Sequence, residues 1–237
     1  MRRTTLRVAV VGGCGACAYL NLVRPWHLRW GATDEEVREP LNGDDEVPSS
    51  TVQATRAITI DAPPKDVWPW VAQIGYVGYG RAGYYAFDFW DADSGRGRSS
   101  WRLIPEAQEL YVGLRIGEEG FTVRSFEPNE HLVLAYHYPS VEWVLKDGLW
   151  PKFGHCSWSF VLRETPEGGT RLVVRMRVTL GGIGVHLLSW PLFEVGDFLQ
   201  HWRMMPGIKR RAERLLEDPR GRAVGGSTAP TRRPSRS

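Results

Sequence analysis

Two neighbouring segments of alternating apolar and polar residues constrain the fold of this chain most. They cover residues 156–163 and 171–180, and the segment between them contains Pro166, Gly168 and Gly169. Alternation with a period of two is typical of a half-buried strand, and a short segment with proline and glycine is typical of a turn. The pattern therefore predicts an antiparallel hairpin with one apolar face, made by Trp158, Phe160, Leu162, Leu172, Val174, Met176 and Val178.

The opposite face of this hairpin carries arginines, which are Arg163, Arg171, Arg175 and Arg177. An antiparallel sheet can pack on the core with one face and leave the other in solvent. We therefore expect the arginine face to contact water.

The same periodicities predict the other elements. Short strands are expected at residues 55–60, 114–116, 121–126 and 131–138. Residues 65–74 have apolar side chains at helical spacing, with Asp61 placed to cap the helix and Pro63 or Pro64 suited to its first turn.

A long helix is expected over residues 187–216. Pro191 would start or interrupt this helix, and Pro206 is a position where it could kink. Consecutive antiparallel strands followed by a long helix indicate the α+β class. In the α/β class, strands and helices would alternate along the chain. A curved antiparallel sheet that grips this helix would leave room for an apolar cavity between the two.

Three segments carry a family resemblance. They are WGATDEE at residues 30–36, ATRAITIDAPPKDVWPWV at residues 54–71 and GIKRRAE at residues 207–213. Over about residues 30–216 the chain resembles bacterial proteins of the SRPBCC superfamily, also called the START or polyketide cyclase/dehydrase-like superfamily. The resemblance implies a helix-grip fold whose cavity binds lipids, sterols, polyketides or other apolar molecules. Only some members are enzymes, and they share no universal catalytic motif.

These observations divide the chain into four parts. Residues 1–30 are a hydrophobic N-terminal segment that serves as an anchor or signal, and residues 31–52 are an acidic linker. Residues 53–217 form the SRPBCC-like helix-grip domain, and residues 218–237 are a disordered basic tail.

The N-terminal segment contains an uncharged run from Val8 to Val23, preceded by Arg2, Arg3 and Arg7. This run is short for a transmembrane helix, which needs about 20 apolar residues. We expect a short anchor in the cell membrane; the alternatives are a cleaved signal peptide of a secreted protein and a buried helix of a cytoplasmic one. Cys14 and Cys17 are interpreted as small apolar residues, because no second pair or βαβ context accompanies them.

The formal net charge of +3 comes from the ends of the chain, since residues 1–30 and 219–237 carry arginines and no acids. Residues 31–52 are strongly acidic. A nucleic-acid-binding domain presents its basic residues on the face that meets phosphate. We therefore expect no nucleic-acid partner.

The expected cavity has an apolar, aromatic lining. The chain has 11 Trp. This large aromatic area suggests that the core encloses another molecule in addition to packing against itself. We predict that the ligand contacts Tyr85, Trp90, Leu134, Tyr136, Trp158, Phe160, Met176 and Met204.

Catalytic residues are harder to find. Asp88 in the aromatic cluster is a weak candidate for proton transfer, and the alternative is a helix cap or a surface carboxylate. Strand parity places His137 and His155 on the outer face, away from the expected cavity. No metal site is expected from His186, His201, Met204 and Met205, because their spacing does not match a metal site and packing of the last helix explains them better. No cofactor motif is present either.

The sequence thus predicts a protein that binds a hydrophobic small molecule, lipid or polyketide-like, in an internal cavity. One alternative is a cyclase or dehydratase-type enzyme acting on a polyketide-like substrate through Asp88 or a tyrosine. Another is a membrane-tethered interaction module with a filled core. The predicted partners are an apolar ligand and, through residues 8–23, a membrane.

Overall fold

The computed structural model describes residues 17–76, 82–86, 99–116, 120–137, 153–180 and 189–217. Their strands form one six-stranded antiparallel sheet in the order β1-β6-β5-β4-β3-β2. The strands are β1 (Val52–Ile60), β2 (Arg115–Ile116), β3 (Phe121–Glu127), β4 (His131–His137), β5 (Phe153–Glu164) and β6 (Thr170–Leu180). The helices are η1 (Tyr19–Val23), α2 (Arg24–Leu28), α3 (Asp34–Arg38), α4 (Pro64–Ala72), η3 (Pro105–Gln108) and α6 (Ser189–Glu217).

The predicted hairpin is confirmed as β5 and β6. Trp158 pairs with Met176, and Phe160 pairs with Val174. Paired residues of antiparallel strands share a face of the sheet, so the apolar side chains of both strands lie on one side, which we call the inner face. The predicted strands and the predicted C-terminal helix are also present, within a few residues of the expected bounds.

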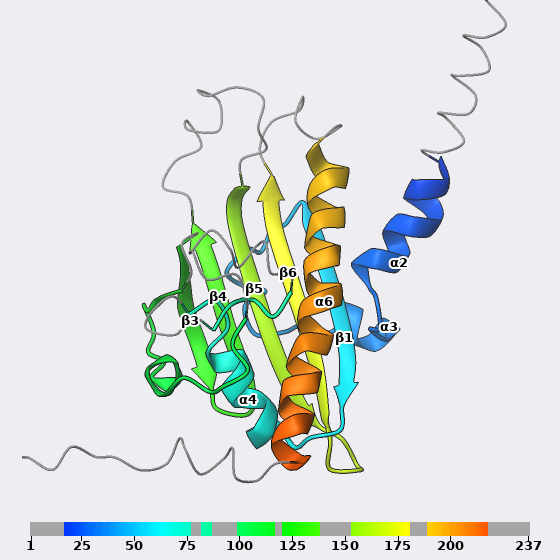
Figure 1. Ribbon diagram of the computed structural model, residues 1–237. Helices are drawn as coiled ribbons and strands as arrows, with labels where there is room; N and C mark the ends of the chain where they lie inside the picture. The colour runs from blue at the N-terminus through cyan, green and yellow to red at the C-terminus, as the bar shows by residue number, and fades with distance from the viewer. Residues whose placement is uncertain are drawn as a thin grey trace, which may run out of the picture.

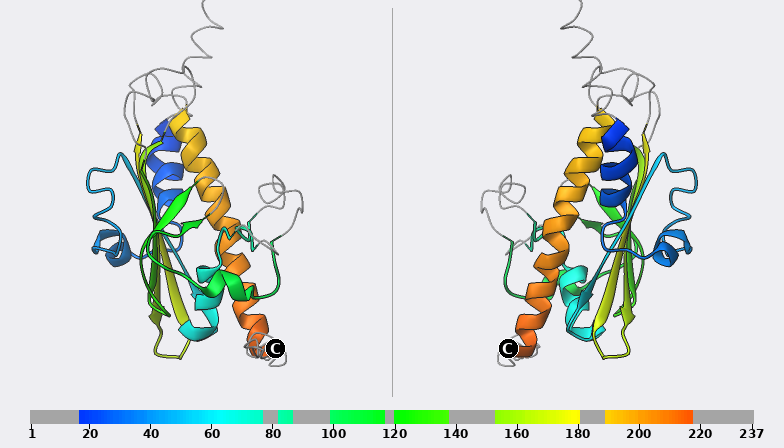
Figure 2. Two further views of the ribbon diagram at one scale, coloured as in Figure 1. Left: turned by 90° about the vertical axis from the view of Figure 1, so that its left-hand side faces the viewer. Right: turned by 90° about the vertical axis from the view of Figure 1, so that its right-hand side faces the viewer.

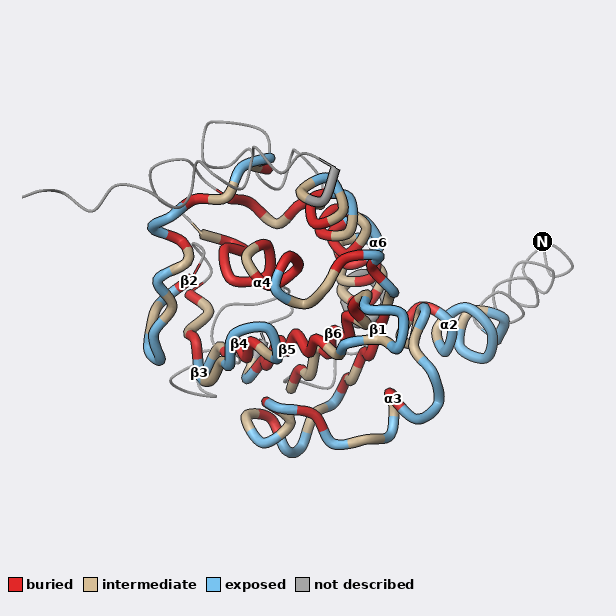
Figure 3. Tube along the Cα trace, turned by 90° about the horizontal axis from the view of Figure 1, so that it is seen from below, coloured by how far each residue is buried: buried red, intermediate tan, exposed pale blue. Residues whose placement is uncertain are grey.

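Helices α4 and α6 both cover the inner face (Figures 1 and 3). The main core lies between these two helices and the sheet, and its fully buried members include Val67, Leu132, Leu172, Ile208 and Ala212. The arrangement of a single antiparallel sheet packed against a long C-terminal helix agrees with the expected helix-grip architecture.

Helix α4 begins as expected at a proline, because Pro64 occupies its first turn. The expected cap by Asp61 is wrong. Residue Pro63 precedes the helix with no side-chain hydrogen bond, and the Asp61 carboxylate instead accepts a bond from Lys209 Nζ at 3.2 Å. The second proline of the pair already fixes the backbone angle needed to start a helix.

Helix α6 runs unbroken across Pro206, and Gly207 follows in the same buried stretch. A Cβ atom at Gly207 would overlap the carbonyl oxygen of Tyr85. Glycine therefore allows the helix to approach the backbone of residues 82–86 closely.

The outer face of the sheet is covered by the acidic segment 31–52, as the edge-on views show (Figure 2). The expectation that the arginine face contacts water is therefore wrong at Arg175, whose side chain is only 2% exposed. Ser157 and Ser159 on the same face are also buried. The sequence signal for this cover was the opposite charge of the two parts, which are far apart along the chain.

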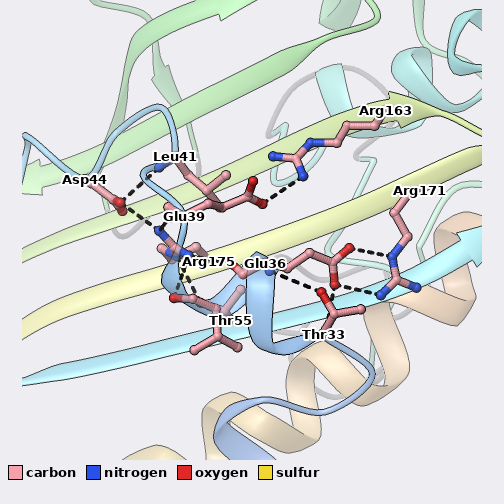
Figure 4. A network of polar contacts seen from close by, with 10 residues as sticks. Thr33, Glu36, Glu39, Leu41, Asp44, Thr55, Arg163, Arg171 and Arg175 are labelled. Atoms are coloured by element: carbon pink, nitrogen blue, oxygen red, sulfur yellow. Dashed lines mark hydrogen bonds and ion pairs between the residues drawn. The ribbon is translucent and has the colours of Figure 1, made fainter.

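Ion pairs hold the acidic segment on the sheet (Figure 4). Arg171 Nε donates to Glu36 Oε1 at 2.7 Å, and Arg175 Nη1 donates to Asp44 Oδ2 at 2.7 Å. Arg163 forms a third pair with Glu39 at 2.7 Å. Helix α3 begins within this segment at a capping box, where Thr33 Oγ1 accepts from Glu36 N and the Glu36 carboxylate accepts from Thr33 N.

The described part of the N-terminal segment forms η1 and α2, of which α2 contacts α6 and η1 leads away from it (Figure 1). Within the described ranges, none of the helices has the length and apolar character needed to cross a membrane. Residues 1–16 and the predicted basic tail 218–237 lie outside the described residues.

Candidate functional site

The inner face of the sheet is not buried uniformly. Near the turn that joins β5 and β6, Leu162 and Leu172 are buried within the main core. Toward the end where β4 finishes and α6 begins, Phe121, Tyr136 and Met176 belong to inward-facing positions but are only half-buried. We call these three residues and Tyr84, which is also half-buried, the upper site.

The aromatic rings of the upper site gather around Trp158. The ring centroid of Trp158 lies 5.7 Å from that of Phe121 and 6.2 Å from that of Tyr84. Phe121 in turn lies 6.1 Å from Tyr136. Tilted rings at these separations attract one another and present an apolar surface to any molecule that contacts them.

A buried charged cluster borders the upper site. Arg56 occupies an inner-face position of β1, opposite Val174, and its side chain is 1% exposed. Its Nη1 atom donates to Asp197 Oδ2 on α6 at 2.6 Å, and its Nε atom donates to the His27 carbonyl at 2.9 Å. His201 completes this group, which we call the Arg56 cluster, with Nδ1 3.1 Å from Asp197 Oδ1.

The cluster touches the aromatic group through one hydrogen bond. Trp158 Nε1 donates to His201 Nε2 at 2.9 Å, and an indole N–H can only donate. The Nε2 atom of His201 must therefore accept, which places its ring proton on Nδ1, toward the main-chain oxygen of Asp197 at 2.8 Å.

Asp197 is ionised in this setting. Burial alone would raise the pKa of its carboxyl group, but the charge of Arg56 and the contacts with His201 outweigh burial and hold the pKa well below the ordinary value. The Nη2 atom of Arg56 is buried and has no hydrogen-bond partner among the described residues. The guanidinium therefore retains donor capacity for one more acceptor.

The sequence-predicted lining residues fall into three groups. Leu134, Trp158, Phe160, Met204 and Tyr85 are buried in the main core, with 0% exposure for Phe160 and Met204. Tyr136 and Met176 are half-buried in the upper site. Trp90 lies outside the described residues, as does the catalytic candidate Asp88. Ligand contact by each of these residues stays a prediction.

His137 and His155 lie on the outer face, as strand parity predicted. Their Nδ1 atoms are 3.1 Å apart, and His137 Nε2 is 2.9 Å from Glu46 Oε2 in the acidic segment. Within the described residues no group of three or more His, Cys, Asp or Glu side chains could hold a metal ion. Cys156 is buried beside Met176, and Cys17 is exposed.

The sequence reasoning missed Phe121, Arg56 and Asp197. Strand parity could have found Arg56, because it interrupts an inward series that is otherwise apolar, from Val52 to Ile60. No local pattern could have paired it with Asp197, which lies 141 residues further along the chain.

No protein-family model and no curated protein sequence matches the chain. Among solved structures, the chain is similar to the Zhui aromatase/cyclase from Streptomyces sp. R1128, with 14% identity, a TM-score of 0.41, and coverage of 71% of this chain and 97% of that one. It is also similar to Aha1 from Colwellia psychrerythraea, with 16% identity, a TM-score of 0.32, and coverage of 65% and 94%.

A third similar structure is Ara h 8.0201, with 10% identity, a TM-score of 0.36, and coverage of 69% of this chain and 98% of that one. These three proteins are members of the SRPBCC superfamily, which the sequence was expected to resemble. Similarities this low transfer neither a ligand nor a reaction to this chain.

Proposed function

We propose that this protein binds an apolar small molecule, lipid or polyketide-like, between the upper site and α6. The observation that supports the proposal is the half-buried state of Phe121, Tyr136 and Met176 at inward-facing positions of the sheet. Equivalent positions further along the same strands, such as Leu132 and Leu172, are completely buried.

The energetic reason is the area that these side chains leave in contact with water. Covering apolar surface stabilises a complex by about 25 cal/mol per Å². A ligand that covers the upper site would complete the burial that α6 and α4 provide for the rest of the inner face. Aromatic side chains with a few polar groups beside them are typical of small-molecule sites.

The Arg56 cluster supports a ligand with one polar end. Arg56 Nη2 is a buried donor without an acceptor among the described residues, and the cluster contacts Trp158 directly. An oxygen atom of a ligand would satisfy this donor and would orient the molecule. A wholly apolar ligand would leave Arg56 Nη2 without an acceptor.

The first experiment looks for the ligand itself. The purified full-length protein would be examined by native mass spectrometry, and its organic-solvent extract would be analysed for small molecules. The proposal expects an apolar molecule in stoichiometric amount, or saturable binding of added fatty acids or aromatic polyketides to the emptied protein.

A pair of substitutions at Met176 tests the location. Met176→Trp fills space at the upper site and is expected to weaken binding at least about tenfold, which corresponds to about 1.4 kcal/mol. Met176→Leu keeps the apolar volume nearly unchanged and serves as the matched control, with binding close to wild type. Equal affinity in both variants, with both proteins folded, would place the ligand elsewhere.

Two other functions are outcomes of the same work. Asp88, the carboxylate that a cyclase or dehydratase reaction was expected to use, lies outside the described residues, so a reaction is not proposed. Turnover of a bound polyketide that is lost in Asp88→Asn, while binding is retained, would support the enzyme. Absence of any ligand in saturation experiments would support an interaction module with a filled core.

A further inference from the structure

Two adjacent helices carry exposed apolar side chains. On η1 and α2, Leu22, Val23 and Trp26 are 71%, 46% and 54% exposed. Leu22 and Val23 precede Trp26 by four and three residues, so the three side chains share one side of the helical segment. On α6, Leu199 and Trp202 are 38% and 44% exposed and are separated by one turn.

Trp26 lies near the α6 residues because α2 contacts α6, and Leu22 and Val23 extend the exposed apolar side of the same helical segment along η1, which leads away from α6 (Figure 1). The Trp26 ring lies 5.2 Å from the ring of Phe198, in an edge-to-face arrangement. Phe198 adjoins Leu199 in sequence and lies one turn from Trp202. We call the surface made by Leu22, Val23, Trp26, Leu199 and Trp202 the α2–α6 patch.

The position of α2 is fixed by polar contacts. Arg24 Nε and Nη2 donate to the two carboxylate oxygens of Glu194 on α6, each at 2.8 Å. The Glu194 side chain is only 1% exposed, so this paired bond is shielded from water on one side. Trp26 of α2 is therefore held at the surface while the helix itself is attached to the domain.

We propose that the α2–α6 patch rests on the surface of a lipid bilayer. Contiguous exposed apolar residues on a folded domain mark interaction sites, and tryptophan is enriched where a membrane meets water. The uncharged run from Val8 to Val23 leads directly into the patch, and Arg2, Arg3 and Arg7 precede it. A bilayer with anionic lipids suits this combination of apolar and basic residues.

The patch also lies at the same end of the domain as the upper site. Leu28 of α2 and Phe193 of α6 pack against the small core that includes Cys156 and Val178, and Tyr136 packs against that core too. Docking would therefore bring the upper site close to the lipid surface. The membrane contact does not depend on the proposed ligand, and its test measures vesicle binding alone.

The test compares two pairs of charge substitutions in the full-length protein. Cosedimentation would be measured with vesicles of phosphatidylcholine and phosphatidylglycerol. The double variant Leu199→Glu/Trp202→Glu is expected to lower the partition coefficient at least about tenfold, because two carboxylates replace apolar groups at an anionic surface. The control Tyr111→Glu/Val112→Glu changes two apolar residues outside the patch that are more exposed than Leu199 and Trp202, at 61% and 64%, and is expected to bind like wild type.

Two results would overturn the proposal. Wild-type binding by Leu199→Glu/Trp202→Glu would show that the N-terminal run binds lipid without the patch. The second result is a wild-type protein that does not bind vesicles but forms a dimer, as measured by light scattering. If Leu199→Glu/Trp202→Glu abolishes that dimer, the patch binds a second copy of the chain. Circular dichroism would verify that each variant is folded.

Discussion

Arg56 is a charged residue in a position of β1 where the surrounding residues favour an apolar side chain. Its neighbours at inward positions of β1 are Ala54 and Ile58, and a guanidinium among them must be neutralised to be tolerated. Asp197 supplies the opposite charge, and His201 joins it to Trp158. A single ion pair thus links β1, α6 and the aromatic group of the upper site.

Removing one partner of this pair should be costly. Asp197→Ala leaves the Arg56 guanidinium buried without its carboxylate, and the free energy of unfolding is expected to fall by about 3–5 kcal/mol. The double variant Arg56→Met/Asp197→Leu removes both charges and should unfold near the wild-type urea midpoint. The buried pair would be refuted by a loss below about 1 kcal/mol in Asp197→Ala.

His27 gives the stability a pH dependence. Its side chain is buried on α2, and burial lowers its pKa below the ordinary value of 6.5. The unfolded chain therefore binds a proton at a higher pH than the folded one, so the contribution of His27 is complete above pH 6.5 and is lost as the pH falls from there toward the lowered pKa.

The expected result is that the wild type loses more stability than His27→Gln between pH 7.5 and pH 5, as measured by urea unfolding at both values. The Gln variant keeps a polar side chain but does not titrate, which makes it the matched control. Parallel losses in the two proteins would mean that His27 does not contribute.

Among the elements of the fold, the acidic segment 31–52 lies across the outer face of the sheet and is bonded to it. Arg175 anchors it with bonds to Asp44 Oδ2, to the carbonyl of Glu36 at 2.7 Å and to the carbonyl of Glu39 at 2.9 Å. The bond to the Glu36 carbonyl is buried, and a buried acceptor left without a partner costs about 1–3 kcal/mol. The segment was expected to be a linker, and its contacts make it part of the outer layer of the domain.

The contact between α6 and residues 82–86 depends on Gly207. Gly-to-Ala changes inside helices usually stabilise a protein by about 0.5–1 kcal/mol. At Gly207 the new methyl group would overlap the Tyr85 carbonyl, so Gly207→Ala is expected to destabilise by about 1–3 kcal/mol.

Gly196 in the same helix provides the control, because a Cβ atom there has nothing within 4 Å. Gly196→Ala is expected to raise the thermal midpoint, and Gly207→Ala to lower it, in calorimetric scans of the two variants. The same sign of change at both positions would contradict the close approach of α6 to Tyr85.

In the molecule as a whole, the half-buried inner-face residues Phe121, Tyr136 and Met176 lie at the end of the sheet remote from the β5–β6 turn. The α2–α6 patch lies at the same end. The two proposals therefore concern one region, in which an apolar ligand site and a lipid-facing surface would be neighbours. They remain separable, since Met176→Trp acts on the first and Leu199→Glu/Trp202→Glu on the second.

Much of the fold could be predicted from sequence because local patterns carry it. Period-two alternation located β5 and β6 and their shared apolar face, and helical spacing located α6. The site was less predictable. Tyr136 and Met176 could be assigned to the inner face by parity, but parity does not tell how completely the helices cover each position.

The order of the elements, the inner faces of the strands and the outward placement of His137 and His155 follow from local patterns, because they depend on residues that are neighbours along the chain. Three contacts could be seen only in the folded molecule: Arg56 with Asp197, residues 31–52 with Arg175, and Trp26 with Phe198. Each of these contacts joins segments distant in the chain. Packing and charge in the folded chain determine which residues meet, and the pattern of residues within one segment contains no information about a distant segment.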